Sequence, residues 1–347
     1  MLSAKIMDRP HHPIVRLLGT ALLSLLATPV GASGPDAAPV AATGLHALDL
    51  RVAHIGENLA VAAHDLCQHR VARTGIDLHS RAQYGRLTGE QARAMFPIPN
   101  GVAVLLVVNG SSAQQSGIGE GEGLIDIDGA AVPLSPPGRR PDYAPTRQAL
   151  DMLDAAMTDG EAWLRLRATD GSERRVHLRG TPGCPTRFQM APGGGLEAEA
   201  DGAYVKIGQA MVEAAPDDDL LAASLAHELA HNILRHRERQ NAAGMRRGLA
   251  RMFGRNAALS RAAESEADRL VPWLLARAGF QPEAALRWLD LLEQRVGPSA
   301  PTHPSWTRRR QTIREQLSLL AAQPGEGRAL DPPFDTINPG PLEPDAD

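Results

Sequence analysis

The sequence predicts an α+β protein of several domains, with a mainly α-helical C-terminal half after a smaller mixed unit. Apolar residues recur at spacings of three and four near the N-terminus and again after residue 216, which is typical of amphipathic helices. Between them, residues 101–179 contain short runs that alternate like strands. With 347 residues, of which 43% are apolar, the chain can form two modest domains with a real core.

The N-terminus has the pattern of a secretory signal peptide over residues 1–32. Lys5, Arg9 and Arg16 supply the basic part, the stretch "LLGTALLSLLA" is apolar, and small residues lead to a cleavage site near Ala32. We therefore expect an exported, periplasmic protein with no transmembrane anchor after cleavage. The alternative is that this segment stays attached as an N-terminal anchor. The stretch 33–44, rich in Gly, Pro and Ala, predicts a linker.

Residues 45–94 are expected to form an N-terminal helical segment, because apolar side chains from Leu45 to Leu66 follow the helical spacing. The chain has two cysteines, Cys67 and Cys184. In an exported protein an even number of cysteines suggests a disulfide, and two free buried thiols are the alternative.

The mixed unit is expected over residues 95–180. Its predicted elements are a strand at 101–108, a short helix, a strand at 124–128, a helix at 146–157 and strands at 161–168 and 173–179. With "GSSAQQSGI" and "GEGLIDIDGAAV", this segment resembles the PDZ domains of bacterial envelope proteases. The resemblance implies that a peptide ligand can add to a sheet edge beside helix 146–157, with the loop 96–101 binding its carboxylate. The alternative is an α+β unit that binds no ligand.

The remaining chain, residues 181–323, is expected to begin with a turn-rich connector over 181–200 and then to become helical. The predicted helices start near 216 and continue at about 257–278, 282–295 and 305–322. The tail, residues 324–347, is Pro-rich and acidic and is expected to be disordered.

The string "LAHELAHNILRH" indicates a metal site. His227 and His231 are four residues apart, so both imidazoles project from one helix face, at the spacing that holds one Zn²⁺. Glu228 lies beside them, where a general base belongs. His236 is expected to point well round the helix, as a surface residue or as one that contacts a ligand from behind.

A third ligand is predicted from "SRAAESEADRL". Glu264 and Asp268 share a helix face, so Glu264 can reach the metal while Asp268 accepts the second ring N–H of a ligating histidine. Glu266 is expected to point elsewhere.

These motifs, together with "THPSWTRRR", resemble metallopeptidase family 48, which includes the HtpX heat-shock protease, the CAAX prenyl endoprotease and soluble periplasmic zinc proteases. The resemblance covers residues 205–320 and implies a gluzincin-type domain that binds one Zn²⁺. Its implied site residues are His227, His231 and Glu264 as zinc ligands, Glu228 as the base that activates a zinc-bound water, Asp268 as the orienting acid, and His303 and Arg309 as catalytic residues that stabilise the oxyanion or gate the metal.

The sequence thus predicts a zinc metalloendopeptidase with an inserted PDZ-like domain, acting on protein or peptide substrates in envelope quality control. A net charge of −4 with scattered basic residues argues against a nucleic-acid partner. Two other classes stay open: a periplasmic peptide-binding scaffold or chaperone with a latent protease site, and a structural protein that needs no metal.

Overall fold

The computed structural model describes the backbone of residues 37–84, 87, 89–246, 248–323, 330–337 and 340–345, and the side chains from residue 44 onward. From Ala42 onward the contacts join the chain into one compact unit. The predicted signal peptide and the first residues of the linker lie outside the described residues. No helix within the described ranges is both long enough and apolar enough to cross a membrane.

Helix α1 (Ala37–Ala62) covers the first predicted helical stretch and begins inside the predicted linker. The helical prediction for 45–94 is wrong beyond this point, because strands β1 (Val71–Arg73) and β2 (Ile76–Ser80) follow, with only short helical pieces after them. These pieces are η1 (Arg81–Gln83) and α2 (Gly89–Met95). In β2, the apolar residues Ile76 and Leu78 alternate with the polar residues Asp77 and His79, as in a strand, but over only five residues, which is a weak signal.

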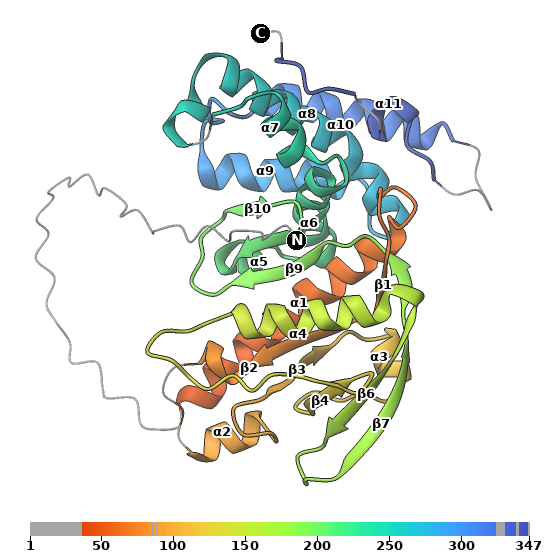
Figure 1. Cartoon of the computed structure of the whole chain (residues 1–347). Helices are drawn as coiled ribbons and strands as arrows, with labels where there is room; N and C mark the ends of the chain where they lie inside the picture. Colours follow the sequence, from red (N-terminus) through yellow and green to blue (C-terminus); the bar gives the residue numbers. More distant parts are fainter. Residues whose placement is uncertain are drawn as a thin grey trace, which may run out of the picture. The chain divides into compact units, whose positions relative to one another are not determined.

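The first sheet is antiparallel, in the order β2-β3-β4-β6-β7 (Figure 1). The short strand β5 pairs with β4. Its further strands are β3 (Val102–Val107), β4 (Gly123–Ile127), β5 (Ala130–Ala131), β6 (Glu161–Arg167) and β7 (Glu173–Arg179). Asp128 and Gly129, with φ of 50° and 81°, make the tight turn between β4 and β5. Two successive positive φ values suit a hairpin whose strands twist right-handedly.

Three short helices accompany this sheet: α3 (Ser112–Gln115), α4 (Ala144–Ala156) and η2 (Met157–Asp159). Helix α4 packs on the sheet through Ala149, Leu150 and Leu153, which belong to one buried cluster with Leu78 of β2. The hydroxyl of Thr146 lies 3.0 Å from that of Ser80, which joins the start of α4 to the end of β2. The sheet and α4 therefore form a core of their own.

The predicted carboxylate loop lies in the connection between β2 and β3. Residues 96–101 lead into β3, which pairs with β2 on one side and β4 on the other. Among the described strands of this sheet, β2 and β7 are the outer ones. A peptide can add only to an outer strand. The backbone N–H of Arg81, directly after β2, donates to the carbonyl oxygen of Gly101, so the loop ends beside the outer strand β2, and its binding of a carboxylate stays a prediction.

The predicted connector 181–200 contains strands as well as turns. Strand β8 (Thr181–Gly183) pairs antiparallel with β1, and a separate sheet has the order β10-β11-β9. Its strands are β9 (Arg187–Ala191), β10 (Ala198–Ala200) and β11 (Tyr204–Gly208), and α5 (Gln209–Ala214) follows. In β9 and β11 the buried residues alternate over only five positions each, between glycine-rich turns.

The helical part contains α6 (Asp218–Ile233), α7 (His236–Ala242), η3 (Gly248–Met252), α8 (Gly254–Arg277), α9 (Ala284–Val296), α10 (Trp306–Ala321) and α11 (Phe334–Ile337). Asp217 caps α6, because its carboxylate accepts the backbone N–H of Leu220 at 2.9 Å. A second core joins α1, β9 and β11 to α6, α8, α9 and α10. The mixture of helices and sheets confirms the predicted α+β class.

The tail is ordered where the structure describes it, so the prediction of disorder for 324–347 is wrong for those residues. Leu342 is buried against Leu259 and Ala263 of α8. The backbone N–H of Asp345 donates to the carbonyl oxygen of Ala258 at 3.2 Å. Leu342 and this hydrogen bond join the Pro-rich segment to α8.

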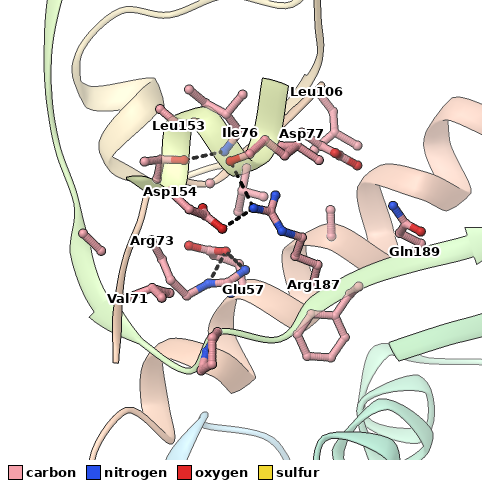
Figure 2. A pocket seen from close by; sticks show the side chains of 18 residues that line it. Glu57, Val71, Arg73, Ile76, Asp77, Leu106, Leu153, Asp154, Arg187 and Gln189 are labelled. Carbon is pink, nitrogen blue, oxygen red and sulfur yellow. Dashed lines mark hydrogen bonds and ion pairs between the residues drawn. The ribbon is translucent and has the colours of Figure 1, made fainter. Parts of the chain in front are cut away.

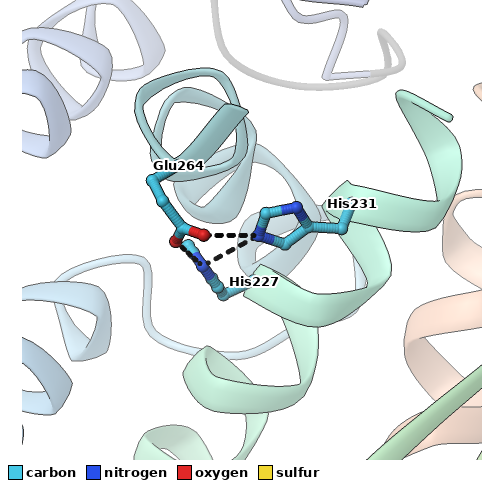
Figure 3. A group of neighbouring side chains, drawn as sticks. All are labelled: His227, His231 and Glu264. Carbon is cyan, nitrogen blue, oxygen red and sulfur yellow. Dashed lines mark hydrogen bonds and ion pairs between the residues drawn. The ribbon is translucent and has the colours of Figure 1, made fainter. Parts of the chain in front are cut away.

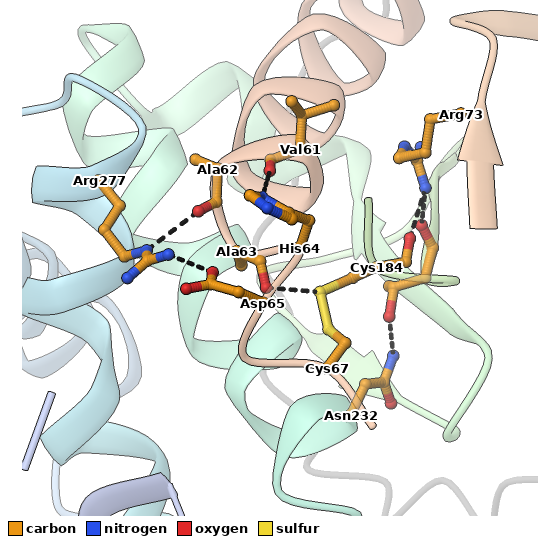
Figure 4. The surroundings of a disulfide bond; sticks show 11 residues. Val61, Ala62, Ala63, His64, Asp65, Cys67, Arg73, Cys184, Asn232 and Arg277 are labelled. Carbon is orange, nitrogen blue, oxygen red and sulfur yellow. Dashed lines mark hydrogen bonds and ion pairs between the residues drawn. A yellow bond between two sulfur atoms is a disulfide. The ribbon is translucent and has the colours of Figure 1, made fainter. Parts of the chain in front are cut away.

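A disulfide joins Cys67 to Cys184, as predicted (Figure 4). The two residues are 117 positions apart, and their Cα atoms lie 5.6 Å apart. Nearby, the guanidinium of Arg73 donates to the carbonyl oxygen of Cys184 at 2.9 Å and to Glu57 of α1. The disulfide therefore closes a loop that contains the whole first sheet.

We expect loss of the disulfide to destabilise the protein by about 2–5 kcal/mol, because a long closed loop restricts the unfolded chain. The test compares urea unfolding of the oxidised wild type with that of Cys67→Ala/Cys184→Ala. As a control, a reductant should lower the midpoint of the wild type and leave that of the double variant unchanged. Equal midpoints for the oxidised wild type and the double variant would contradict the expectation.

His79 of β2 is a buried histidine inside the first sheet unit. Its Nδ1 lies 2.8 Å from the hydroxyl of Tyr84, and its ring packs 4.7 Å from that of Phe96. Burial lowers the pKa of His79 to about 4, and His46 adds to this effect. The unfolded chain thus takes up a proton on this side chain at a pH where the folded protein does not.

A depressed histidine pKa makes the folded state less stable as the pH falls from about 6.5 to about 4. Over this window we expect His79 to contribute a loss of up to about 3 kcal/mol in the free energy of unfolding. Urea unfolding of wild type and His79→Phe between pH 7 and pH 4 measures it. The difference between the two proteins should change across this window, and a constant difference would refute the assignment.

Candidate metal centre

Three potential metal ligands meet between helices α6 and α8 (Figure 3). His227 and His231 come from α6 and Glu264 from α8. The Nε2 atoms of the two histidines are 3.2 Å apart, and a carboxylate oxygen of Glu264 lies 3.1 Å from that of His227. The other oxygen of Glu264 lies 3.7 Å from Nε2 of His231. The structure therefore brings together the three residues that the sequence predicted as ligands.

The two helices bring the ligands together because both are lined with small side chains. Ala223, Ala226 and Ala230 of α6 and Ala267 of α8 are buried in the same core. Alanine side chains let two helix backbones approach closely, so short ligands can meet between them. His227 and Glu264 are almost completely buried, at 3% and 4% exposure, while His231 is half-buried.

The spacing of these atoms fits a tetrahedral metal ion. Ligands held at about 2.0–2.1 Å from a tetrahedral zinc ion lie about 3.3–3.4 Å from one another. The Nε2 atoms of His227 and His231 are 3.2 Å apart, Nε2 of His227 lies 3.1 Å from Glu264, and one ligand atom from each of the three residues lies within 4.8 Å of the others. Two imidazole nitrogens and one carboxylate oxygen are also ordinary ligands for a divalent transition metal. The buried group could thus hold a metal ion.

Asp268 and Arg309 lie behind His227. An oxygen of Asp268 is 3.1 Å from Nδ1 of His227, although it lies off the direction of a hydrogen bond. Both oxygens of Asp268 accept from Arg309, each at 2.8 Å. Burial opposes a charge on His227, but the contacts with Asp268 and Glu264 outweigh it and raise the pKa of His227 to about 9. The buried carboxylate of Asp268 therefore contacts this ring from behind and favours its charged form.

Glu228 directly follows His227 and is half-buried. Burial raises the pKa of its carboxyl group above the usual value, while His231 and His227 act in the opposite direction. A carboxylate that binds protons more readily than usual, next to a metal site, suits a general base.

The structure gives different surroundings to His303 and Arg309, the two residues expected to stabilise the oxyanion or to gate the metal. His303 lies at the cluster, with Nε2 3.5 Å from Glu264, and its Nδ1 is 3.0 Å from the hydroxyl of Thr302. Arg309 instead points its guanidinium at Asp268, and the group lies 5.1 Å from the ring centre of Trp288. Arg309 is only 2% exposed. These contacts favour a supporting role for Arg309 over the expected catalytic one.

His236 is buried at the cluster, although the sequence pattern placed it well round the helix. Its Nδ1 lies 2.8 Å from Nδ1 of His231, and its Nε2 lies 3.0 Å from Glu266. The periodicity of one continuous helix could not reveal this contact, because α6 ends before His236.

A separate cavity of about 80 Å³ lies among α1, the turn between β1 and β2, the end of α4 and β9 (Figure 2). Two ion pairs line it, Arg73 with Glu57 and Arg187 with Asp154. Arg187 also donates to the carbonyl oxygen of Leu150 at 3.2 Å. The cavity is far smaller than the roughly 300–1,000 Å³ of a typical ligand pocket.

A peptide ligand at the edge of β2 stays a prediction.

Comparison of the chain with models of known protein families and with curated proteins gave no match. The assignment of the site therefore depends on its motifs and geometry.

We expect the purified protein to retain about one equivalent of a divalent metal, and Glu264→Gln to lose most of it, because a neutral amide is a poorer ligand for such an ion. Metal analysis after dialysis measures this. Glu228→Gln is the matched control and should keep the wild-type metal content. If Glu264→Gln retained as much metal as the control, Glu264 would not be a ligand.

Proposed function

We propose that this chain is a zinc-dependent endopeptidase of the metallopeptidase 48 type. The observation that carries the proposal is the buried His227–His231–Glu264 group with Glu228 beside it. Two histidines and a glutamate, with a carboxylate that ligates nothing next to them, are the residues that zinc peptidases use. The alternative of a structural protein without metal does not explain why three ligands converge in the core.

A zinc ion bound to these three residues would supply Lewis acidity toward a water molecule and a peptide carbonyl. Glu228 accepts a proton from the attacking water as the oxygen bonds to the carbonyl carbon. It then delivers that proton to the leaving nitrogen as the C–N bond breaks. The products are a carboxylic acid and an amine, so the hydrolysis needs no other reactant.

The neighbouring residues divide the supporting tasks. Asp268, held by Arg309, keeps the ring of His227 facing Glu264. His303 is 35% exposed and lies at the cluster, so it is placed to donate to the oxyanion of a substrate or to cover the site.

We further propose that the protein is exported and acts on proteins of the cell envelope. The disulfide supports this, because disulfides persist in oxidising compartments such as the periplasm. The first sheet unit, PDZ-like in sequence, has β2 as an outer strand beside α4, which is where an extended peptide ligand would add.

Replacing Glu228 by Gln removes the proposed base and leaves the metal ligands in place. We expect casein cleavage to fall at least about 100-fold with unchanged zinc content. The exchange Glu90→Gln, at an exposed position of α2, is the matched control and should cleave like the wild type. Zinc-loaded wild-type protein that cleaves no casein would count against the endopeptidase, and a fully active Glu228→Gln would exclude Glu228 as the base.

A further inference from the structure

The chain breaks sharply between α6 and α7. Arg235 lies between the two helices, with φ 52° and ψ 40°, in the left-handed region. For a residue other than glycine this conformation costs roughly 1–2 kcal/mol. Such strain persists only where the surrounding structure holds it, and it is common at functional sites.

The break changes the direction of His236. In one continuous helix, His236 would be turned by about 140° from His231, because successive residues are about 100° apart. After the left-handed residue, His236 begins α7 and its ring faces His231. The two ring centres are 4.7 Å apart, and His236 is only 2% exposed.

A chain of polar contacts leads from His231 into the protein. Nδ1 of His231 meets Nδ1 of His236 at 2.8 Å, and Nε2 of His236 meets a carboxylate oxygen of Glu266 at 3.0 Å. Arg239 of α7 donates to both oxygens of Glu266. This histidine relay, as we call His236, Glu266 and Arg239, is drawn from α7 and α8.

The contacts fix the direction of each hydrogen bond. Glu266, paired with Arg239, can only accept, so Nε2 of His236 donates to it. A neutral imidazole has one donor and one acceptor, so Nδ1 of His236 accepts. Nδ1 of His231 must then donate, and its Nε2 keeps a free lone pair. That Nε2 is the atom that faces His227 and Glu264.

We propose that the histidine relay is a positioning device that holds His231 in the tautomer and orientation required of a metal ligand. The inference rests on the proposed metal site and adds three residues to it. It gives the two ligating histidines matching support. Asp268, bound by Arg309, lies directly behind His227, and Glu266, bound by Arg239, supports His231 through His236.

The geometry of α8 explains why His236 lies between Glu266 and His231. Glu264 and Glu266 are two residues apart on α8, so their side chains leave the helix about 200° apart. Glu264 faces the metal ligands of α6, and Glu266 therefore cannot approach His231 from the same side. The ring of His236 bridges the gap between them.

The test is the zinc affinity of the full-length protein, measured by competition with a chelating dye. We expect His236→Ala and Glu266→Gln to bind zinc at least about 10-fold more weakly, as for other residues that orient a ligand. The double variant should be no weaker than His236→Ala alone, because Glu266 acts through His236. His79→Ala is the matched control: it removes another buried, hydrogen-bonded histidine and should leave zinc affinity unchanged.

A second readout does not need the metal. Nitrogen-15 chemical shifts of the imidazoles in the metal-free protein, assigned with His231→Asn, should show His231 protonated on Nδ1 in the wild type and a mixture of tautomers in His236→Ala. If His236→Ala fails to fold, the nearly isosteric Glu266→Gln carries the affinity test.

Zinc affinities within about twofold of the wild type for both His236→Ala and Glu266→Gln would overturn the relay. So would a wild type that binds no zinc, which would also remove the metal centre. A wild type whose zinc affinity depends on the relay residues but that cleaves no protein would refute the endopeptidase alone. The two proposals can therefore fail separately.

Discussion

The contact between α6 and α8 is the constraint on which the site depends. It buries His227, Glu264 and Asp268, and α10 adds the buried Arg309; the charged forms of these groups are costly to remove from water. Each has a partner of opposite character within about hydrogen-bond distance. If one member were missing, another would be left buried and unpaired, so the positions of these side chains are fixed together. In a site assembled in this way the contacts among its own side chains position the ligands, as precise metal geometry requires.

Much of the helical half could be predicted from sequence because its signals are local. The spacing of His227 and His231 determines that they share a face of α6, and the four-residue step from Glu264 to Asp268 does the same on α8. That the two faces meet could be inferred only from the chemistry of a metal with three ligands. The disulfide is likewise predicted without a local pattern, from the even number of cysteines in a chain expected to be exported.

The predictions from sequence fail where long-range contacts or backbone geometry decide the structure. Strands β1 and β8 are three residues each, and each exists because it pairs with the other across more than a hundred residues. Periodicity within one segment carries no trace of such a partner. The direction of His236 is predicted wrongly for a different reason. Arg235 adopts a backbone conformation that favours glycine, and an arginine in the sequence gives no sign of that conformation. Leu342, a single apolar residue among prolines, gave no pattern from which its burial could be predicted.

The pairing of β1 with β8 has a consequence for how such a chain could arise and be rebuilt. The first sheet leaves the rest of the protein and returns to it at one place, where Val71 is opposite Gly183 and Arg73 is opposite Thr181. Its core is separate from the one that surrounds α6 and α8. The segment between Arg73 and Thr181 is thus an inserted unit whose two ends lie side by side. A short hairpin turn could replace it, or an unrelated domain with adjacent termini could be exchanged for it, without moving the helices that bear the metal ligands.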